Sequence, residues 1–270
     1  MLSGEIMDRN RRIPRIMHQI YLNGEMPKHL KRNVEIHKAC NPHWEHRLYD
    51  EEAAKGMIVE HYGEEMLSRY QRISDQYPAA RADLLRHLII YAYGGVYFDI
   101  KSCFDRPLDE IIRVNDSYLL AQWQNGPCEQ NEGWGVHHDL VHIPGGEYIS
   151  YFIIAESGHP FSKAVIDKIV RNIANYRPWS AVGRTGVLRT TGPIAYTLGI
   201  HSIRDQHSYR WVTEAELGCR PSLLDDYDHA TSFQKKHYSL LINPVITLSR
   251  FGTALSAGFV QLRCLKNRFG

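Results

Sequence analysis

The sequence predicts an α/β domain, because segments typical of strands alternate with segments typical of helices along most of the chain. The prediction rests on a strand-like opening segment that runs into a turn, an apolar helix that ends at a double glycine, and a strand that follows this glycine pair directly. With 270 residues, of which 43% are hydrophobic, the chain can bury a sizeable core. Since no repeat of about 20 to 50 residues and no linker interrupts it, we expect one domain over residues 1–270.

The first elements form a β-α-β unit. Residues 13–22 are rich in β-branched and aromatic side chains and stop at Asn23-Gly24, which indicates a strand followed by a turn. Residues 28–40 have the length and polarity of a surface helix, and residues 44–49 indicate a second short strand. This order and spacing are typical of a parallel strand pair.

The middle of the chain continues the alternation. Residues 79–93 carry apolar side chains at helical spacing, and the helix is expected to stop at Gly94-Gly95. Residues 96–100 predict the strand that follows. The remaining elements are two strands and a helix, over residues 118–121, 148–155 and 161–176.

Two regions do not fit this alternation. Residues 122–147 hold five Gly, two Pro and three His without a clean period. A loop of that length is usually functional or disordered, so we interpret it as a lid or an acceptor-binding segment. Beyond Arg204 the pattern weakens, and residues 201–270 are assigned only as the C-terminal part of the same domain.

Charge and composition exclude several classes of protein. Lys and Arg number 32 against 30 Asp and Glu, so the net charge of +2 argues against a dedicated nucleic-acid-binding protein. The five cysteines form no C-x-x-C pair, and we expect reduced thiols in a cytoplasmic protein. The start lacks an apolar core segment, and residues 88–98 are far shorter than the roughly 20 apolar residues of a membrane span. We therefore expect neither a signal peptide nor a transmembrane helix.

The helix over residues 79–93 carries a charged pair on an otherwise apolar segment. Asp83 and Arg86 are three residues apart and therefore share a helix face. The pair is either an ordinary ion pair, which is common, or part of a site beside the double glycine.

The strand that follows has one polar side. Alternation places Tyr97, Asp99 and Lys101 together and three apolar side chains opposite them. Ligands of open α/β sheets bind beyond the carboxyl ends of the strands, where Asp99 and Lys101 are expected. The polar side is thus either an exposed strand end or part of a binding site.

The sequence resembles glycosyltransferase family 32 in its sugar-nucleotide-binding signature, with DLLR at residues 83–86 and GGVYFD at residues 94–99. That family contains mannosyltransferases and capsular-polysaccharide enzymes, and the large clostridial glucosylating toxins carry a similar region. Further segments agree in order, at residues 13–21, 41–42 with 49–50, 158–161 and 190–193. The resemblance therefore covers residues 13–200.

The resemblance implies a GT-A fold, which is a Rossmann-like mixed sheet flanked by helices. It also implies transfer of a hexose from a UDP- or GDP-hexose donor, with retention at the anomeric carbon. By the same resemblance, Tyr21 lies against the nucleobase, and Asp83 and Arg86 hold the donor sugar and diphosphate. Tyr97 and Asp99 match the tyrosine and the first acid of the D-x-D motif.

Lys101 departs from the family pattern, which usually has a second Asp at this position to bind a divalent ion. Either the Lys101 ammonium supplies the positive charge that a leaving diphosphate needs, or Asp99, water and a downstream group such as His237 hold Mn²⁺ or Mg²⁺. The candidate catalytic residues are therefore Asp83, Arg86, Asp99 and Lys101, and the candidate metal ligands are Asp99 and His237.

The segment Thr191-Gly192-Pro193 indicates the start of a helix, with Thr191 as the cap and Pro193 in the first turn. Such a start aims free backbone N–H groups at an anionic or hydroxyl-rich ligand. Capping alone explains the pattern equally well. The resemblance places this segment at the floor of the active site, so we expect Thr191 and Gly192 beside the donor sugar.

Two segments near the C-terminus carry alternatives. The acidic run over residues 225–229 is either a solvated loop or a site for a metal or a sugar. Residues 250–270 mix apolar and basic side chains, as an amphipathic helix does that packs on its own domain or lies on an anionic bilayer surface.

We therefore predict a retaining hexosyltransferase that modifies a glycan or lipid-linked acceptor in polysaccharide or glycoconjugate synthesis. We expect no nucleic-acid partner and expect peripheral membrane association through the C-terminal segment. One alternative is a catalytically impaired nucleotide-sugar- or glycan-binding protein, which Lys101 motivates. Another is a phosphate-ester hydrolase that uses Asp99 and Asp105, although no nucleophile elbow, P-loop or H-E-x-x-H motif supports it.

Overall fold

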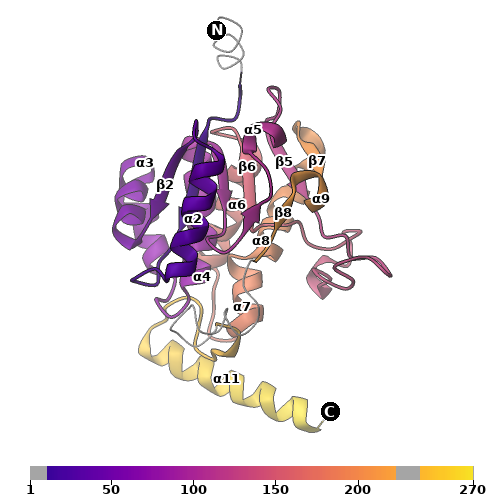
Figure 1. The fold of residues 1–270 in the computed structure, drawn as a ribbon. Coiled ribbons are helices and arrows are strands. Elements are labelled where there is room, and N and C mark those ends of the chain that lie inside the picture. Colours follow the sequence, from indigo (N-terminus) through magenta and orange to yellow (C-terminus); the bar gives the residue numbers. More distant parts are fainter. Residues whose placement is uncertain (1–10, 223–237, 270) are drawn as a thin grey trace, which may run out of the picture.

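The computed structural model describes residues 11–222 and 238–269 and is built around a six-stranded mixed sheet (Figure 1). The strand order is β2-β1-β3-β6-β5-β7. β1 lies parallel to β2 and β3, β6 lies antiparallel to β3 and β5, and β5 lies parallel to β7. The strands are β1 (Ile16–Ile20), β2 (Glu45–Tyr49), β3 (Gly95–Phe98), β5 (Tyr118–Ala121), β6 (Phe152–Ala155) and β7 (Arg210–Val212). A separate antiparallel ladder joins β4 (Cys103–Phe104) to β8 (Cys219–Arg220).

Helices cover both faces of the sheet. The helices are α2 (Lys28–Cys40), α3 (Glu51–Gln71), α4 (Pro78–Tyr93), α5 (Leu108–Ile111), α6 (Pro160–Ala174), α7 (Gly183–Thr190), α8 (Pro193–His201), α9 (Glu214–Leu217) and α11 (Arg250–Phe269), with short 3-10 turns η1 (His138–Leu140), η2 (Arg204–Gln206) and η3 (Tyr238–Leu240). Tyr97 of β3 packs into the core formed with α3, α4, α6 and α8, whereas Val96 and Phe98 pack into the core on the opposite face. β3 is therefore buried on both faces, and the predicted α/β class with a mixed central sheet is confirmed.

The double glycine lets α4 turn directly into the central strand β3. Gly94 has a φ of 66° and Gly95 a φ of 99°, in the left-handed region that favours glycine. A Cβ at Gly94 would lie 2.6 Å from the backbone nitrogen of Ser157, and a Cβ at Gly95 would overlap the carbonyl oxygen of Ile16 in β1. The turn therefore requires both glycines, and it reverses the chain so that β3 runs back along α4.

Most of the predicted elements are confirmed. The helices predicted over residues 28–40, 79–93 and 161–176 begin and end within two residues of the expected bounds. The strands predicted over residues 44–49 and 118–121 are also present, and β1 and β2 are parallel as expected.

Three predicted strands are shorter than expected. The strand predicted over residues 13–22 is limited to β1, Ile16–Ile20. The strand predicted over residues 148–155 begins only at Phe152, and Tyr148 forms an isolated bridge to Gln122. The strand predicted over residues 96–100 ends at Phe98, because the N–H of Ser102 donates to the carbonyl of Asp99 and closes a turn. The alternation argument for Lys101 therefore stops short of that residue.

The largest element that the sequence patterns leave unpredicted is α3. Its N-cap is Asp50, whose carboxylate accepts hydrogen bonds from the N–H groups of Glu52 and Ala53. Gly56 and Gly63 interrupt its helical pattern, and Gly63 has a φ of 74° that kinks the helix. Glycine is unfavourable inside a helix, so the sequence gives a weak signal for this segment.

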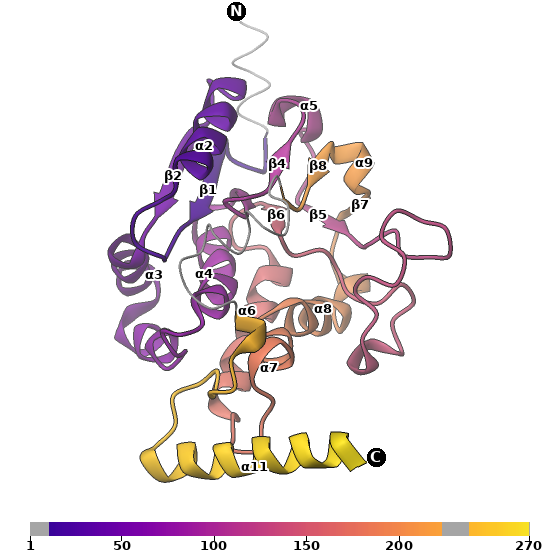
Figure 2. The ribbon, with the colours of Figure 1, turned by 60° about the horizontal axis from the view of Figure 1, so that its bottom comes forward.

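Residues 122–147 form the long loop that the sequence predicts, and η1 is the regular element within it. α11 lies beyond α7 and stands apart from the sheet in both views (Figures 1 and 2). The acidic run over residues 225–229 lies outside the described residues. Among the described residues, no helix is both long and apolar enough to cross a membrane.

Candidate active site

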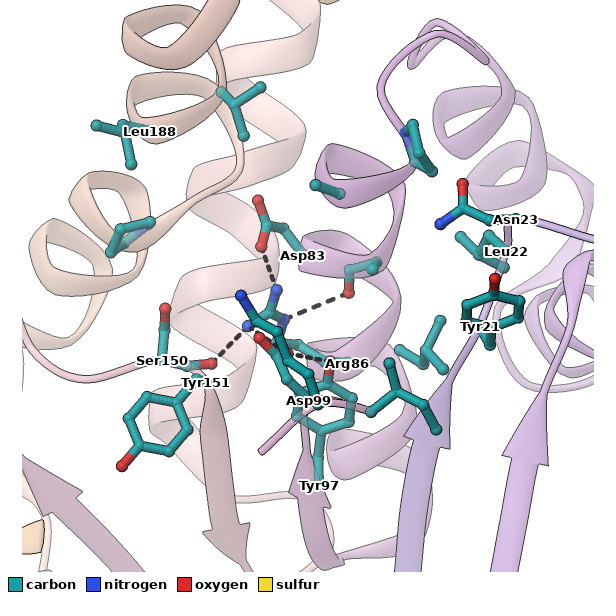
Figure 3. A pocket seen from close by; sticks show the side chains of 18 of the residues that line it. Tyr21, Leu22, Asn23, Asp83, Arg86, Tyr97, Asp99, Ser150, Tyr151 and Leu188 are labelled. Atoms are coloured by element: carbon teal, nitrogen blue, oxygen red, sulfur yellow. Dashed lines mark hydrogen bonds and ion pairs between the residues drawn. The ribbon is translucent and has the colours of Figure 1, made fainter. Parts of the chain in front are cut away.

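A cavity of about 320 Å³ opens where the carboxyl ends of β1 and β3 meet the first half of α4 (Figure 3). Tyr21, Leu22 and Asn23 follow β1 and form one wall. The other walls come from α4, the turn after β3, the segment before β6, and the α7–α8 junction. This location at the carboxyl edge of the strands is the one that the sequence predicts for Asp99.

Arg86 is the centre of a buried polar cluster in this cavity. One of its terminal nitrogens donates to Asp83 Oδ1, and the other donates to the Ser150 carbonyl and lies 3.6 Å from Asp99 Oδ1 (Figure 3). The guanidinium carbon lies 5.1 Å from the centre of the Tyr97 ring. The prediction that Asp83 and Arg86 share a helix face is thus confirmed. Arg86 also connects α4 to the carboxyl end of β3 and to the segment before β6.

The two carboxylates of the cluster are themselves held by hydroxyl groups. The Tyr97 hydroxyl donates to Asp99 Oδ1 over 2.6 Å, and the Thr191 hydroxyl donates to Asp83 Oδ2 over 3.0 Å. Burial raises the pKa of Asp83, and the neighbouring Arg86 opposes that rise. Burial also raises the pKa of Tyr97 well above its usual value, which keeps its hydroxyl a hydrogen-bond donor.

Lys101 lies in the turn after β3 and lines the same cavity as Asp99. Burial lowers the pKa of its ammonium group, while Asp99 opposes this shift and Arg86 adds to it. The turn, not strand alternation, brings Lys101 to the cavity. The two cations Arg86 and Lys101 thus balance the two carboxylates among the described residues that line the cavity.

The turn that carries Lys101 is fixed by a buried asparagine on α2. Asn33 Nδ2 donates to the carbonyls of Ile100 and Ser102, each over 3.0 Å. The Ser102 hydroxyl donates to the carbonyl of Pro221 over 2.8 Å. The sequence patterns miss Asn33, and the available signal is the presence of an Asn, a poor helix former, within a helix.

Tyr151 connects the cavity to the second, smaller ladder. It lines the cavity, and its hydroxyl donates to Glu214 Oε1 over 2.7 Å and lies 3.1 Å from the Cys219 sulfur. Burial raises the pKa of Glu214. Tyr151 and the carbonyl of Ser150 are contacts that no short motif in the sequence indicates.

The segment predicted to start a helix does so, but Thr191 is not its cap. Gly192 is the N-cap of α8 and Pro193 is the first helical residue. The Thr191 hydroxyl is occupied by Asp83, and the N–H groups of Thr191 and Gly192 both donate to the Val187 carbonyl. The N–H groups of these two residues are therefore not free, and contact of the first turn of α8 with a ligand stays a prediction.

The other two predicted site residues, Tyr21 and Gly192, lie at or beside the cavity. Tyr21 lines the cavity, its hydroxyl donates to the Glu25 carbonyl, and burial raises its pKa. Gly192 lies against Asp83, since a Cβ there would be 3.4 Å from Asp83 Oδ2. Contact of either residue with a nucleobase or a sugar stays a prediction.

The described residues around Asp99 do not fit a divalent metal ion. No group of three or more His, Cys, Asp or Glu side chains that could hold a metal occurs in the described part of the chain. Three of the four carboxylate oxygens of Asp83 and Asp99 already accept hydrogen bonds from Arg86, Thr191 and Tyr97. The other predicted ligand, His237, lies outside the described residues.

Comparison with known proteins identifies similar glycosyltransferases. Residues 27–118 match the family model described as "Glycosyltransferase sugar-binding region containing DXD motif". The chain is 26% identical over 194 residues to mannosyl phosphorylinositol ceramide synthase CSH1 of Saccharomyces cerevisiae, which covers 69% of this chain and 49% of that protein. It is 32% identical over 188 residues to inositol phosphoceramide mannosyltransferase 3 of Schizosaccharomyces pombe, which covers 67% and 43%. The chain thus spans about half the length of the curated relatives it matches.

Solved structures with a similar fold include glycosyltransferase domains of toxins. The PaToxG glycosyltransferase superposes with a TM-score of 0.51 at 12% identity, over 96% of this chain and 92% of that one. The UDP-bound glycosyltransferase domain of the YGT toxin superposes with a TM-score of 0.50 at 9% identity, over 76% and 80%. At these identities the likeness establishes the fold, and the predicted GT-A architecture is confirmed. Residues 27–118 therefore match the sugar-binding region of the DXD-containing glycosyltransferases, and the resemblance of the chain to glycosyltransferase family 32 is confirmed.

Proposed function

We propose that this protein transfers a hexose from a nucleotide-diphosphate sugar to an acceptor, with retention at the anomeric carbon. The observation that carries the proposal is the buried Asp83–Arg86–Asp99 cluster in the wall of a cavity at the carboxyl ends of β1 and β3. The family match and the mannosyltransferase relatives support it. A mannosyl donor is the first candidate for this reason, within the class of UDP- and GDP-hexoses.

The chain's own residues divide into four roles in this proposal. Asp83 and Asp99 present carboxylate oxygens to hydroxyl groups of the donor, while Arg86 holds both acids in position. Tyr21 lies on the wall that would receive the nucleobase. Lys101 supplies a cation for the departing nucleotide diphosphate, since fixed positive charge placed where negative charge develops lowers the barrier.

We further propose that Lys101 takes the place of a bridging metal ion. In the described part of the chain no group of side chains that could hold a metal ion surrounds Asp99, and Lys101 lines the same cavity. A Lys ammonium is a compact point charge that can approach phosphoryl oxygens directly. Transfer that survives chelation would support this role.

The proposed acceptor is a glycan or a lipid-linked acceptor in polysaccharide or glycoconjugate synthesis. The names of the relatives, which act on inositol phosphoceramide, support a lipid acceptor. We also propose that the protein is cytoplasmic and binds peripherally to a membrane.

The test is a donor panel read in two ways on the same protein. UDP- and GDP-hexoses are screened first for thermal stabilisation, since a ligand at 100 times its Kd stabilises by about 2.7 kcal/mol. Donors that bind are then assayed for transfer, and NMR of the anomeric proton reports retention. Binding without turnover would favour the catalytically impaired binding protein, and no binding by any donor would contradict both.

A phosphate-ester hydrolase has less support. Asp105, its second proposed acid, pairs with Arg220 over 2.9 Å and is not among the residues that line the cavity. Release of inorganic phosphate from simple esters would revive that alternative.

A further inference from the structure

We propose that α11 lies in the headgroup region of an anionic bilayer and holds the mouth of the cavity at the membrane surface. The docking surface is the apolar stripe of α11, defined as Phe251, Leu255, Phe259 and Leu262. These side chains are between 38% and 75% exposed. Their spacing of four, four and three residues places them on one face of the helix. A soluble helix normally turns such a face toward its own core, and this one does not.

The helix is attached to the rest of the protein through a different face. Gly252 and Ser256 are buried and Val260 is half-buried, and these residues recur every four positions beside the stripe. Phe259 also contacts Trp179, with ring centres 6.1 Å apart. The helix therefore packs on the domain through one face while its apolar stripe stays exposed. Figure 2 shows α11 running across the end of the molecule beyond α7.

The charge of this segment identifies the surface that it fits. Residues 250–270 contain four Lys or Arg and no Asp or Glu, although the whole chain is nearly balanced at 32 to 30. Basic residues near an anionic membrane each contribute about 1 kcal/mol of attraction. A helix that combines exposed Phe and Leu with basic charge is typical of binding in the membrane interface. A second copy of the same basic segment would instead repel it.

The stripe lies at the end of the molecule where the cavity opens. α7 contributes Val187 and Leu188 to the cavity wall, and it also contacts η3 in the segment that leads to α11. In the same segment, Asn243 Nδ2 donates to Gln76 Oε1, which lines the cavity, over 2.6 Å. The segment that leads to α11 carries two more exposed apolar side chains, Leu240 and Ile242. A membrane-anchored acceptor would thus meet the cavity from the bilayer side, a consequence that rests on the proposed function.

Co-sedimentation with vesicles tests the surface without any donor. The full chain is mixed with vesicles of phosphatidylcholine alone, or of equal parts phosphatidylcholine and phosphatidylglycerol, at low and high salt. We expect binding to the anionic vesicles that weakens with salt. Replacing Phe251, Leu255 and Leu262 by Gln should weaken it by at least about tenfold, because apolar burial in the interface is lost.

The matched control replaces Thr253, Ala254 and Ala257 by Gln on another exposed part of α11 and should bind like the wild type. Absence of vesicle binding by the wild type, or equal binding by the stripe and control variants, would overturn the proposal. So would a dimer in analytical ultracentrifugation that the stripe variant alone converts to a monomer. Transfer to a soluble acceptor should be unchanged in the stripe variant, so a failure of the proposed function shows up in that assay and leaves the vesicle result standing.

Discussion

Two pairs of opposite charges, each one helical turn apart, have different surroundings in this protein. Lys163 and Asp167 on α6 are about half exposed and bond to each other. Asp83 and Arg86 on α4 have side chains no more than 10% exposed and are bonded further to a hydroxyl, a carbonyl and a second acid. An exposed pair contributes about 0 to 1 kcal/mol, whereas a buried pair carries a desolvation cost that close partners must offset.

The difference shows that residue spacing alone does not identify a site. Both pairs follow the same helical rule, and only the buried pair faces a cavity. Because the buried pair is both a structural link and a candidate binding group, its removal affects folding and function together. The predictions below separate these two effects.

The largest expected effect is on stability. Arg86→Ala leaves the buried carboxylates of Asp83 and Asp99 without their cation and should lower the free energy of unfolding by about 3 to 5 kcal/mol. Lys163→Ala is the matched control and should cost at most about 1 kcal/mol. Chemical denaturation of the two variants measures both values. Similar small losses would mean that burial does not distinguish the pairs.

A smaller change in free energy is expected when Lys101, the second cation of the cavity, is replaced. Lys101→Ala should reduce kcat/KM by about a hundredfold, since one electrostatic group at a site of developing charge contributes about 3 to 4 kcal/mol. Wild-type transfer should persist in EDTA. If EDTA abolishes transfer, Mn²⁺ restores it and Lys101→Ala is harmless, then Lys101 has no such role.

Loss of the Asn33 side chain, which fixes the turn that carries Lys101, should reduce catalysis less than loss of Lys101 itself. Asn33→Ala leaves the carbonyls of Ile100 and Ser102 without their donor, which loosens the turn that carries Lys101. We expect kcat to fall by about tenfold, within the range of about 1 to 3 kcal/mol that an unsatisfied buried polar group costs. Asn125 makes a matched pair of bonds to two carbonyls in the long loop, away from the cavity-lining residues. Asn125→Ala should leave kcat unchanged. Equal kcat values in the two variants would rule out a positioning role for Asn33.

The smallest expected effect is a shift in the pH dependence of kcat/KM. Burial lowers the pKa of Lys101, so its ammonium loses a proton at a lower pH than an ordinary lysine, and kcat/KM should fall on the alkaline side accordingly. Lys101→Arg should move this alkaline limb to higher pH, because a guanidinium stays charged. An alkaline limb that is identical in both proteins would show that another group titrates there.

Local patterns in the sequence predict the parts of the fold that depend on local physics. The Gly94-Gly95 turn, the helix before it and the strand after it follow from glycine's backbone freedom and from helical spacing. The shared face of Asp83 and Arg86 follows in the same way. These elements place the candidate residues at the edge of the sheet where the cavity lies.

Features that depend on distant contacts could not be predicted in this way. Thr191 has the local signature of a helix cap, and its hydroxyl instead donates to Asp83, 108 residues away. The turn at Lys101 is fixed by Asn33 from another helix. The sequence patterns do not predict α3, because its internal glycines weaken the helical pattern. Tertiary packing stabilises this helix instead.

The central claim is that the acids of this cavity act on the donor, and Asp99→Asn tests it most directly. Asp99 is 26% exposed, more than Asp83, and an Asn at this position can still accept the hydrogen bond from Tyr97 while it lacks the charge. Transfer and thermal melting are measured on the same preparation. We predict that transfer is lost and the Tm is unchanged within error. A large fall in Tm with retained specific activity would contradict the claim and assign Asp99 a structural role.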